Sequence, residues 1–122
     1  MSQLDSAAIS AFLREQYALW NQGKRAELMA LFRKLAPQGM TVEFVGTPVQ
    51  DGFKAMDAIW DRHGGHVTIE VVQILVNGGE AAVHALNHHA ERDGRVDTRP
   101  SIEIYRFAEG TLQIRYFYPT GA

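Results

Sequence analysis

The sequence predicts an α+β fold, a cone-shaped barrel in which three N-terminal helices pack on a strongly curved, mostly antiparallel sheet. Three observations support this. The first half contains three stretches with apolar residues at helical spacing, 5–22, 24–35 and 53–63. From residue 66 onward, long runs of β-branched and aromatic residues alternate with glycine turns. The chain of 122 residues suits one hydrophobic core, so we predict a single domain over residues 1–122.

Capping residues and glycines mark the ends of the predicted helices. Asp5 or Ser6 can cap the first helix, and Gly23 follows its last turn. Pro37 ends the second helix, and Gly64 follows the third. The stripe of the first helix that should face the core contains Ile9, Phe12, Leu13, Gln16, Tyr17 and Trp20.

The predicted strands are one short segment, 41–45, and four long ones that form an antiparallel meander. The long strands cover residues 66–76, 81–91, 96–107 and 111–118, and glycine-containing turns join them. The alternation breaks at Val71-Val72, which indicates a β-bulge or a strand buried on both faces. Pro100 donates no backbone hydrogen bond, so its end of the strand should be an edge or a bulge.

Composition excludes several classes of function. The net charge is −2 and the signs are interspersed, so the chain lacks the basic surface expected of a nucleic-acid or membrane binder. It has no cysteine, which rules out disulfides and thiolate chemistry. The first residues form neither a basic nor an apolar segment, and no apolar run approaches the roughly 18 residues of a membrane span. We therefore predict a cytoplasmic protein.

The strand at 96–107 carries the candidate acidic group. Alternation places Ser101, Glu103, Tyr105 and Phe107 on one face, and Ile102 on the other. If the first face lines a closed cavity, a carboxylate there is costly and requires a compensating role or partner. A salt bridge between Glu103 and Arg115, on the next strand, would be the structural alternative.

The neighbouring strand, 81–91, adds a candidate base. Strand parity directs Asn87 and His89 into the cavity beside Glu103. Histidine transfers protons readily near neutral pH, so we predict His89 as general acid/base. Glu103 would orient His89 or donate a hydrogen bond to substrate, and Asn87 would hold a substrate oxygen. The alternative is that these polar residues lie on the surface.

The remaining candidates would form the walls of the cavity and suit a flat, hydrophobic ligand. Each aromatic one could equally be a core residue. Metal binding is not predicted, because the histidine pairs are not held on a common face and no carboxylate cluster completes a set. The predicted wall residues are Gln16, Tyr17, Trp20, Phe44, Trp60, Tyr105, Arg115 and Phe117.

In element order and in four segments, the chain resembles the nuclear-transport-factor-two-like superfamily, in its SnoaL-like and ketosteroid-isomerase-like branch. The segments are Tyr17–Gly23, Leu28–Phe32, Val42–Gly52, and Ile102–Phe107 with its turn at Gly110. The resemblance implies the cone-shaped fold. It leaves the activity open, because members include isomerases, dehydratases, cyclases, epoxide hydrolases and non-catalytic binding domains.

The isomerase pattern of that branch is matched only in part. Its helix-one tyrosine corresponds to Gln16, with Tyr17 one residue further. Its strand-one aspartate, the general base, corresponds to Phe44 or Glu43, and alternation points Phe44 inward. Its second carboxylic acid corresponds to Glu103. The resemblance therefore implies that Glu103 keeps a functional position, while the strand-one base is absent.

Together, these observations predict a small pocketed protein that acts, without cofactor, as an acid/base isomerase, dehydratase or cyclase on a hydrophobic, oxygenated small molecule. The alternative is a non-catalytic domain of the same fold that binds such a molecule or dimerises. We also predict a homodimer through the outer face of the sheet. That face should carry Ile102, Ile104, Ile114, Tyr116 and Tyr118.

Overall fold

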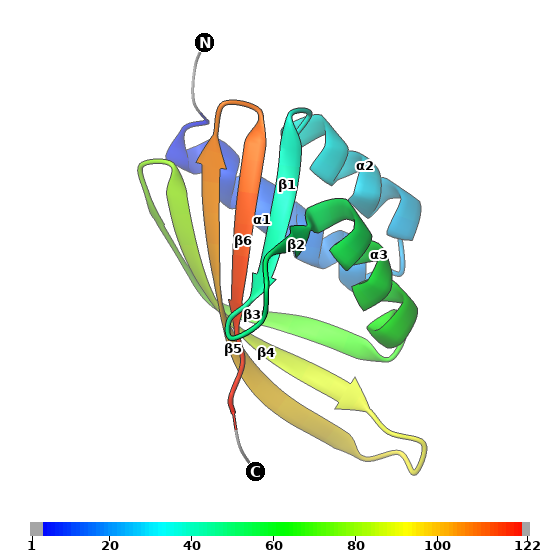
Figure 1. Ribbon diagram of the computed structural model, residues 1–122. Helices are drawn as coiled ribbons and strands as arrows, with labels where there is room; N and C mark the ends of the chain where they lie inside the picture. Colours follow the sequence, from blue (N-terminus) through cyan, green and yellow to red (C-terminus); the bar gives the residue numbers. More distant parts are fainter. Residues whose placement is uncertain (1–3, 121–122) are drawn as a thin grey trace.

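The computed structural model describes residues 4–120, and its helices and long strands follow the predicted order (Figure 1). The one addition is a two-residue strand, β2, where the sequence indicated only a turn. The elements are α1 (Ser6–Asn21), α2 (Arg25–Leu35), β1 (Gly39–Phe44), β2 (Gln50–Asp51), α3 (Gly52–His63), β3 (Val67–Asn77), β4 (Glu80–Ala90), β5 (Val96–Ala108) and β6 (Thr111–Phe117).

The strands form one six-stranded sheet in the order β2-β1-β6-β5-β4-β3. Only β1 and β6 pair in parallel, and the other neighbours are antiparallel. Figure 1 shows the three helices on one side of the strongly curved sheet. The predicted α+β fold is therefore confirmed. In the described residues, no helix is long and apolar enough to cross a membrane.

The core lies between the helices and the inner face of the sheet, and α1 contributes the predicted stripe to it. Asp5 caps α1 by accepting a hydrogen bond from the Ala8 backbone N–H at 2.8 Å. At the other end of α1, Asn21 makes two 2.8 Å hydrogen bonds to the backbone N–H and carbonyl of Ile69 on the edge strand β3. The amide side chain thus occupies backbone groups that a further strand would otherwise pair.

Two features of the strands open one end of the cone. The pairing of β3 with β4 shifts between Val71 and Gln73, which confirms the predicted bulge. The pairing of β5 with β6 begins only at Ile102, so the first residues of β5 pair with β4 alone. Pro100 lies in this stretch, on an edge as predicted. This arm consists of residues 85–90 of β4 paired with 96–101 of β5, with β3 on the other side of β4, and it extends past the end of β6 in Figure 1.

The face assignment of β6 is opposite to the one predicted. Glu103 lies directly across from Tyr116, and residues opposite each other share a face of the sheet. Ile114 and Tyr116 are therefore buried on the inner face, and Arg115 and Phe117 lie on the outer face. The prediction assigned Arg115 and Phe117 to the cavity from alternation within the last strand, but the register of the hairpin decides which of the two faces is the inner one.

Candidate functional site

A cavity of about 760 Å³ lies between the helices and the inner face of the sheet. This volume falls in the range of small-molecule sites. Its lining combines aromatic and aliphatic walls with a few polar groups from α1, α3, β4 and β5. Eight of the predicted site residues line it: Gln16, Tyr17, Trp20, Phe44, Asn87, His89, Glu103 and Tyr105.

The carboxyl group of Glu103 is the centre of the polar part of the cavity. It is only 3% exposed, yet it accepts hydrogen bonds from three hydroxyl groups. Tyr17 and Tyr105 donate to Oε1 at 2.6 and 2.9 Å, and Ser101 donates to Oε2 at 3.0 Å. An ionised carboxylate can accept from all three hydroxyl groups, because it has no donor of its own.

Two amides complete this network. Gln16 donates to the Tyr105 hydroxyl oxygen at 2.7 Å, and Asn87 donates to the Ser101 hydroxyl oxygen at 3.0 Å. Each amide thereby directs the proton of its hydroxyl partner toward Glu103. The predicted role of Asn87 was to hold a substrate oxygen, whereas its N–H groups here bind Ser101 and the backbone carbonyl of Arg99.

Burial raises the pKa of Glu103 above its ordinary value, and the hydrogen bonds from Tyr17, Tyr105 and Ser101 oppose this rise. Burial, together with the negative charge of Glu103, raises the pKa of Tyr17 and of Tyr105 well above the usual value. Both tyrosines therefore stay protonated as donors. Of these groups, Glu103 has the lowest ordinary pKa, so it is the one best suited to exchange a proton.

His89 lies on the same face of the sheet as Glu103, as predicted, but at the open end of the cavity. It pairs with Asp97 across the arm, six residues before Glu103, so the two backbones lie up to roughly 20 Å apart along β5. Among the described residues its ring lies nearest to that of His63, at 5.8 Å between centroids. No hydrogen bond joins it to Glu103 in residues 4–120. The proposed orientation of His89 by Glu103 is therefore wrong, and a catalytic role for His89 itself stays a prediction.

Three predicted wall residues are not in the described lining of the cavity. Trp60 packs behind Trp20, with ring centroids 4.7 Å apart, because it lies on the neighbouring face of α3. Arg115 lies on the outer face, where it donates to Glu43 at 3.0 Å instead of pairing with Glu103. Phe117 is on that face too and is 37% exposed.

The position on β1 that corresponds to the aspartate of the isomerase pattern carries an apolar side chain inside the cavity. Phe44 points inward and stacks on Tyr116 and Tyr118, with centroids 5.4 and 6.2 Å away. Glu43 points outward. These three aromatic rings form one wall in place of a carboxylate base, and Tyr17, one residue beyond the predicted Gln16, is the helix-one donor to Glu103.

Sequence reasoning missed several lining residues. Ser101 contacts Glu103 without itself lining the cavity, and because it shares the parity of Glu103 this contact could have been found from the strand alone. Tyr116 could have been found only from the register of β5 and β6. The other missed lining residues with polar or charged groups, at the open end, are Arg62, His63, Asp97, Arg99, Tyr118 and Thr120.

Metal binding has no support in the described part of the chain. No group of three or more His, Asp or Glu side chains is placed to hold an ion there. The ring of His63 lies 6.3 Å from that of His66 and 5.8 Å from that of His89, between centroids.

A family model for the SnoaL-like domain matches residues 13–115, nearly the whole of the described chain. The chain belongs to the SnoaL-like family. Its fold is that of the nuclear-transport-factor-two-like proteins, as the sequence predicted. A search of curated proteins found no match.

Solved structures agree with this SnoaL-like fold. SalBIII, an epoxide hydrolase/cyclase-like enzyme of pyran ring formation in the polyether salinomycin, superimposes with a TM-score of 0.76 at 17% identity, over 95% of this chain and 94% of its own. AclR of Streptomyces galilaeus, named as a candidate hydroxylase, gives 0.73 at 17% identity over 94% and 91%. A protein of Jannaschia sp. CCS1 assigned to the SnoaL-like polyketide cyclases gives 0.69 at 18% identity over 96% and 91%. At these identities the likeness shows the fold alone.

Proposed function

We propose that this SnoaL-like protein is a cofactor-free acid/base enzyme that isomerises, dehydrates or cyclises a hydrophobic, oxygenated, polyketide-like small molecule. The observation that supports this most directly is Glu103, a buried carboxyl group with three hydroxyl donors at the wall of an aromatic cavity. The names of its structural neighbours, which include cyclases, agree with this class of reaction.

The chemistry follows from the donor set. As a carboxylate, Glu103 can remove a proton from a carbon next to a substrate carbonyl, and the negative charge then moves to the carbonyl oxygen. The protonated carboxyl needs fewer donors. A hydroxyl of Tyr17 or Tyr105 is thereby released to donate to that oxygen. Return of the proton from Glu103 to another atom of the substrate completes an isomerisation and restores the carboxylate.

Deuterium exchange tests this step without knowledge of the final product. The wild-type protein is incubated in D₂O with fused-ring ketones and poly-β-ketone esters, and deuterium at the carbon next to the carbonyl is followed by mass spectrometry. We expect Glu103→Gln to slow the exchange by about 10²- to 10⁴-fold, the usual effect of a general base. Glu43→Gln, which removes a carboxylate from the outer face of the sheet, should leave the rate unchanged. Equal rates for wild type and Glu103→Gln would refute the proposal.

A binding function without catalysis is the second candidate, and the specific observation in its favour is Phe44. An aromatic ring in place of the family's strand-one carboxylate leaves Glu103 without a second carboxylate beside it, since the other acidic residue of the described lining, Asp97, lies at the open end. In that case the ketones would bind, and their exchange rate would not depend on Glu103.

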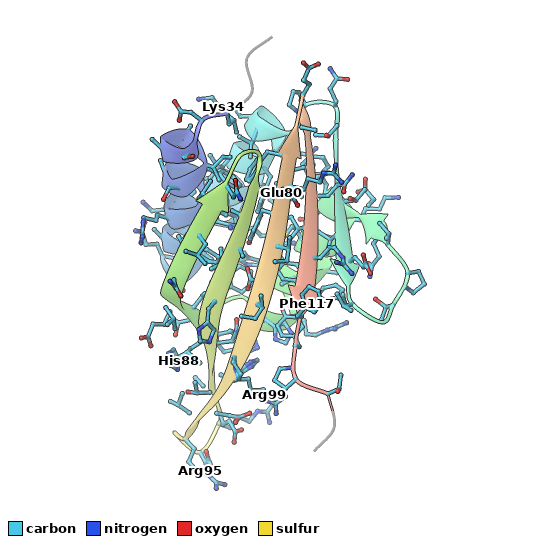
Figure 2. All side chains as sticks on the ribbon, turned by 90° about the vertical axis from the view of Figure 1, so that its left-hand side faces the viewer. Lys34, Glu80, His88, Arg95, Arg99 and Phe117 are labelled. Atoms are coloured by element: carbon cyan, nitrogen blue, oxygen red, sulfur yellow. The ribbon has the colours of Figure 1, made fainter. Side chains whose placement is uncertain are left out.

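We also propose that two copies associate through the outer face of the sheet, which Figure 2 views from the front. The corrected register gives this face a different set of residues from the one predicted. Its exposed apolar residues are Val72, Leu75, Ile102 and Phe117, with exposed fractions of 37–61%. Phe117 and His88 are labelled on this face in Figure 2.

A further inference from the structure

Basic side chains gather at the open end of the cavity, far from Glu103. They come from the last turn of α3, the end of β4 and the start of β5, three elements that meet only in the folded chain. We call this group the basic rim. It consists of Arg62, His63, His89 and Arg99, all of which line the cavity.

One ring contact and the strand register bring three members of the rim together, and the fourth, Arg62, precedes His63 on α3. The rings of His63 and His89 lie 5.8 Å apart between centroids. His89 is opposite Asp97 on β5, which places Arg99 at the diagonal cross-strand position, within reach of a long side chain. Burial, followed by the positive charges of His89 and Arg62, lowers the pKa of His63. The rim therefore places positively charged groups close to His63.

The charge count supports this. Asp97 accepts a 2.7 Å hydrogen bond from Nε of Arg99, which leaves the outer guanidinium nitrogens of Arg99 available. No ion pair or hydrogen bond is recorded for Arg62 within residues 4–120. With both histidines neutral, Arg62, Arg99 and Asp97 leave a net charge of +1 at the rim, and protonation of each histidine adds one more.

We propose that the basic rim binds the carboxylate of the ligand, so that the cavity takes a hydrophobic, oxygenated carboxylic acid. This inference rests on the proposed function, because the basic rim would bind one end of the ligand whose other end reacts at Glu103. Guanidinium groups recognise carboxylates through paired N–H donors. Arg99 and Glu103 are four residues apart on β5, so the carboxylate would lie roughly 13 Å from the group that Glu103 acts on. Aromatic and aliphatic walls fill the distance between them.

Binding of an acid and its matched ester tests the rim. The probe is 11-(dansylamino)undecanoic acid, an anionic hydrophobic chain with an environment-sensitive fluorophore, and its methyl ester is the uncharged control. We expect wild type to bind the acid at least about tenfold more tightly than the ester. The preference should shrink as salt is raised, because both arginines are accessible to solvent.

Three variants locate the preference. The double variant Arg62→Gln/Arg99→Gln should bind the acid and the ester with equal affinity. Its affinity for the ester should equal that of wild type, and this unchanged affinity shows that the variant is folded. Arg92→Gln removes an exposed arginine from the turn of the same arm and should retain the preference. Arg95→Gln, in the same turn, should retain it too, because Arg95 is exposed and pairs with Asp93.

The outcomes separate the two proposals. Equal binding of acid and ester by wild type would overturn the rim as a carboxylate site and leave the proposed acid/base function standing. If Arg62→Gln/Arg99→Gln lowers the affinity for the acid and for the ester by the same factor, the rim is likewise overturned as a carboxylate site and the acid/base proposal stands. Failure of wild type to bind either probe would overturn the inference and would also count against a hydrophobic ligand for the cavity. A preference for the acid without Glu103-dependent deuterium exchange would keep the rim and refute catalysis.

Discussion

The hydrogen bond from Tyr17 to Glu103 allows a quantitative test of the ionised network. Tyr17→Phe removes this 2.6 Å bond and the 3.0 Å contact between the hydroxyl groups of Tyr17 and Tyr105, while the ring remains in place. A hydrogen bond to a charged group contributes about 1.5–3 kcal/mol to stability, and one between neutral groups about 0.5–1.5 kcal/mol. We therefore expect Tyr17→Phe to cost about 2 kcal/mol in wild type at neutral pH, and about 1 kcal/mol in the Glu103→Gln background.

The measurement is a double-mutant cycle, read by urea unfolding at one fixed protein concentration. The coupling free energy between the two substitutions should be about 1 kcal/mol. Tyr118→Phe is the matched control, since Tyr118 lines the same cavity without a recorded hydrogen bond to Glu103. A coupling near zero for Tyr17 would mean that Glu103 is neutral in the folded protein at that pH, and would refute the carboxylate that the proposed base requires.

The pH dependence of the free energy of unfolding independently tests the direction in which folding shifts the pKa of Glu103. Because burial raises the pKa of Glu103, the folded chain binds this proton more tightly than the unfolded chain, in which the group has its ordinary pKa near 4.5. Wild type should therefore lose stability, relative to Glu103→Gln, as pH rises from about 4.5 through the raised pKa. Each unit of difference in pKa corresponds to about 1.4 kcal/mol. A relative gain in stability over that range would show that the hydrogen bonds outweigh burial.

Three further predictions concern the edge strand, the outer face and the rim. Asn21→Ala should lower the free energy of unfolding by about 2 kcal/mol, because both hydrogen bonds to Ile69 are lost, and thermal unfolding would show it; an unchanged Tm would mean that water replaces them. Ile102→Lys should convert a dimer to monomer in light scattering, whereas equal masses for wild type and variant would exclude this face as the interface. His63→Gln should flatten the loss of stability as pH falls below about 6.5, since the lowered pKa of His63 means that the unfolded chain binds its proton more tightly; identical pH profiles would contradict this.

Sequence periodicity was enough to predict the helices, the long strands and the inner face of β5. Each of these depends on one element only, and alternation within a single strand assigns Ser101, Glu103 and Tyr105 to the same side. The bulge near Val72 was predictable for the same reason, because it breaks a local pattern.

The errors arose where two elements had to be placed relative to each other. Arg115 and Tyr116 are neighbours in sequence, so a shift of one residue in the assumed register exchanged a cavity residue for a surface residue. The rim was missed for a related reason. Arg62 and Arg99 belong to α3 and β5, and only the path of the arm past the end of β6 brings them to one opening.

Glu103 and the basic rim, the two polar ends of the cavity, together explain how a ligand would be oriented for proton transfer. Glu103 is a buried carboxyl group with no cation among its recorded partners, an arrangement that costs stability compared with apolar packing. A hydrophobic ligand in an apolar cavity has little reason to adopt one orientation. If its only charge is a carboxylate at the basic rim, the ligand enters with its other end toward β5, and its distal carbonyl is delivered to Tyr17 and Glu103. Orientation by the rim would thus supply the alignment that proton transfer requires, which is why loss of the rim should reduce turnover of an acid far more than that of its ester.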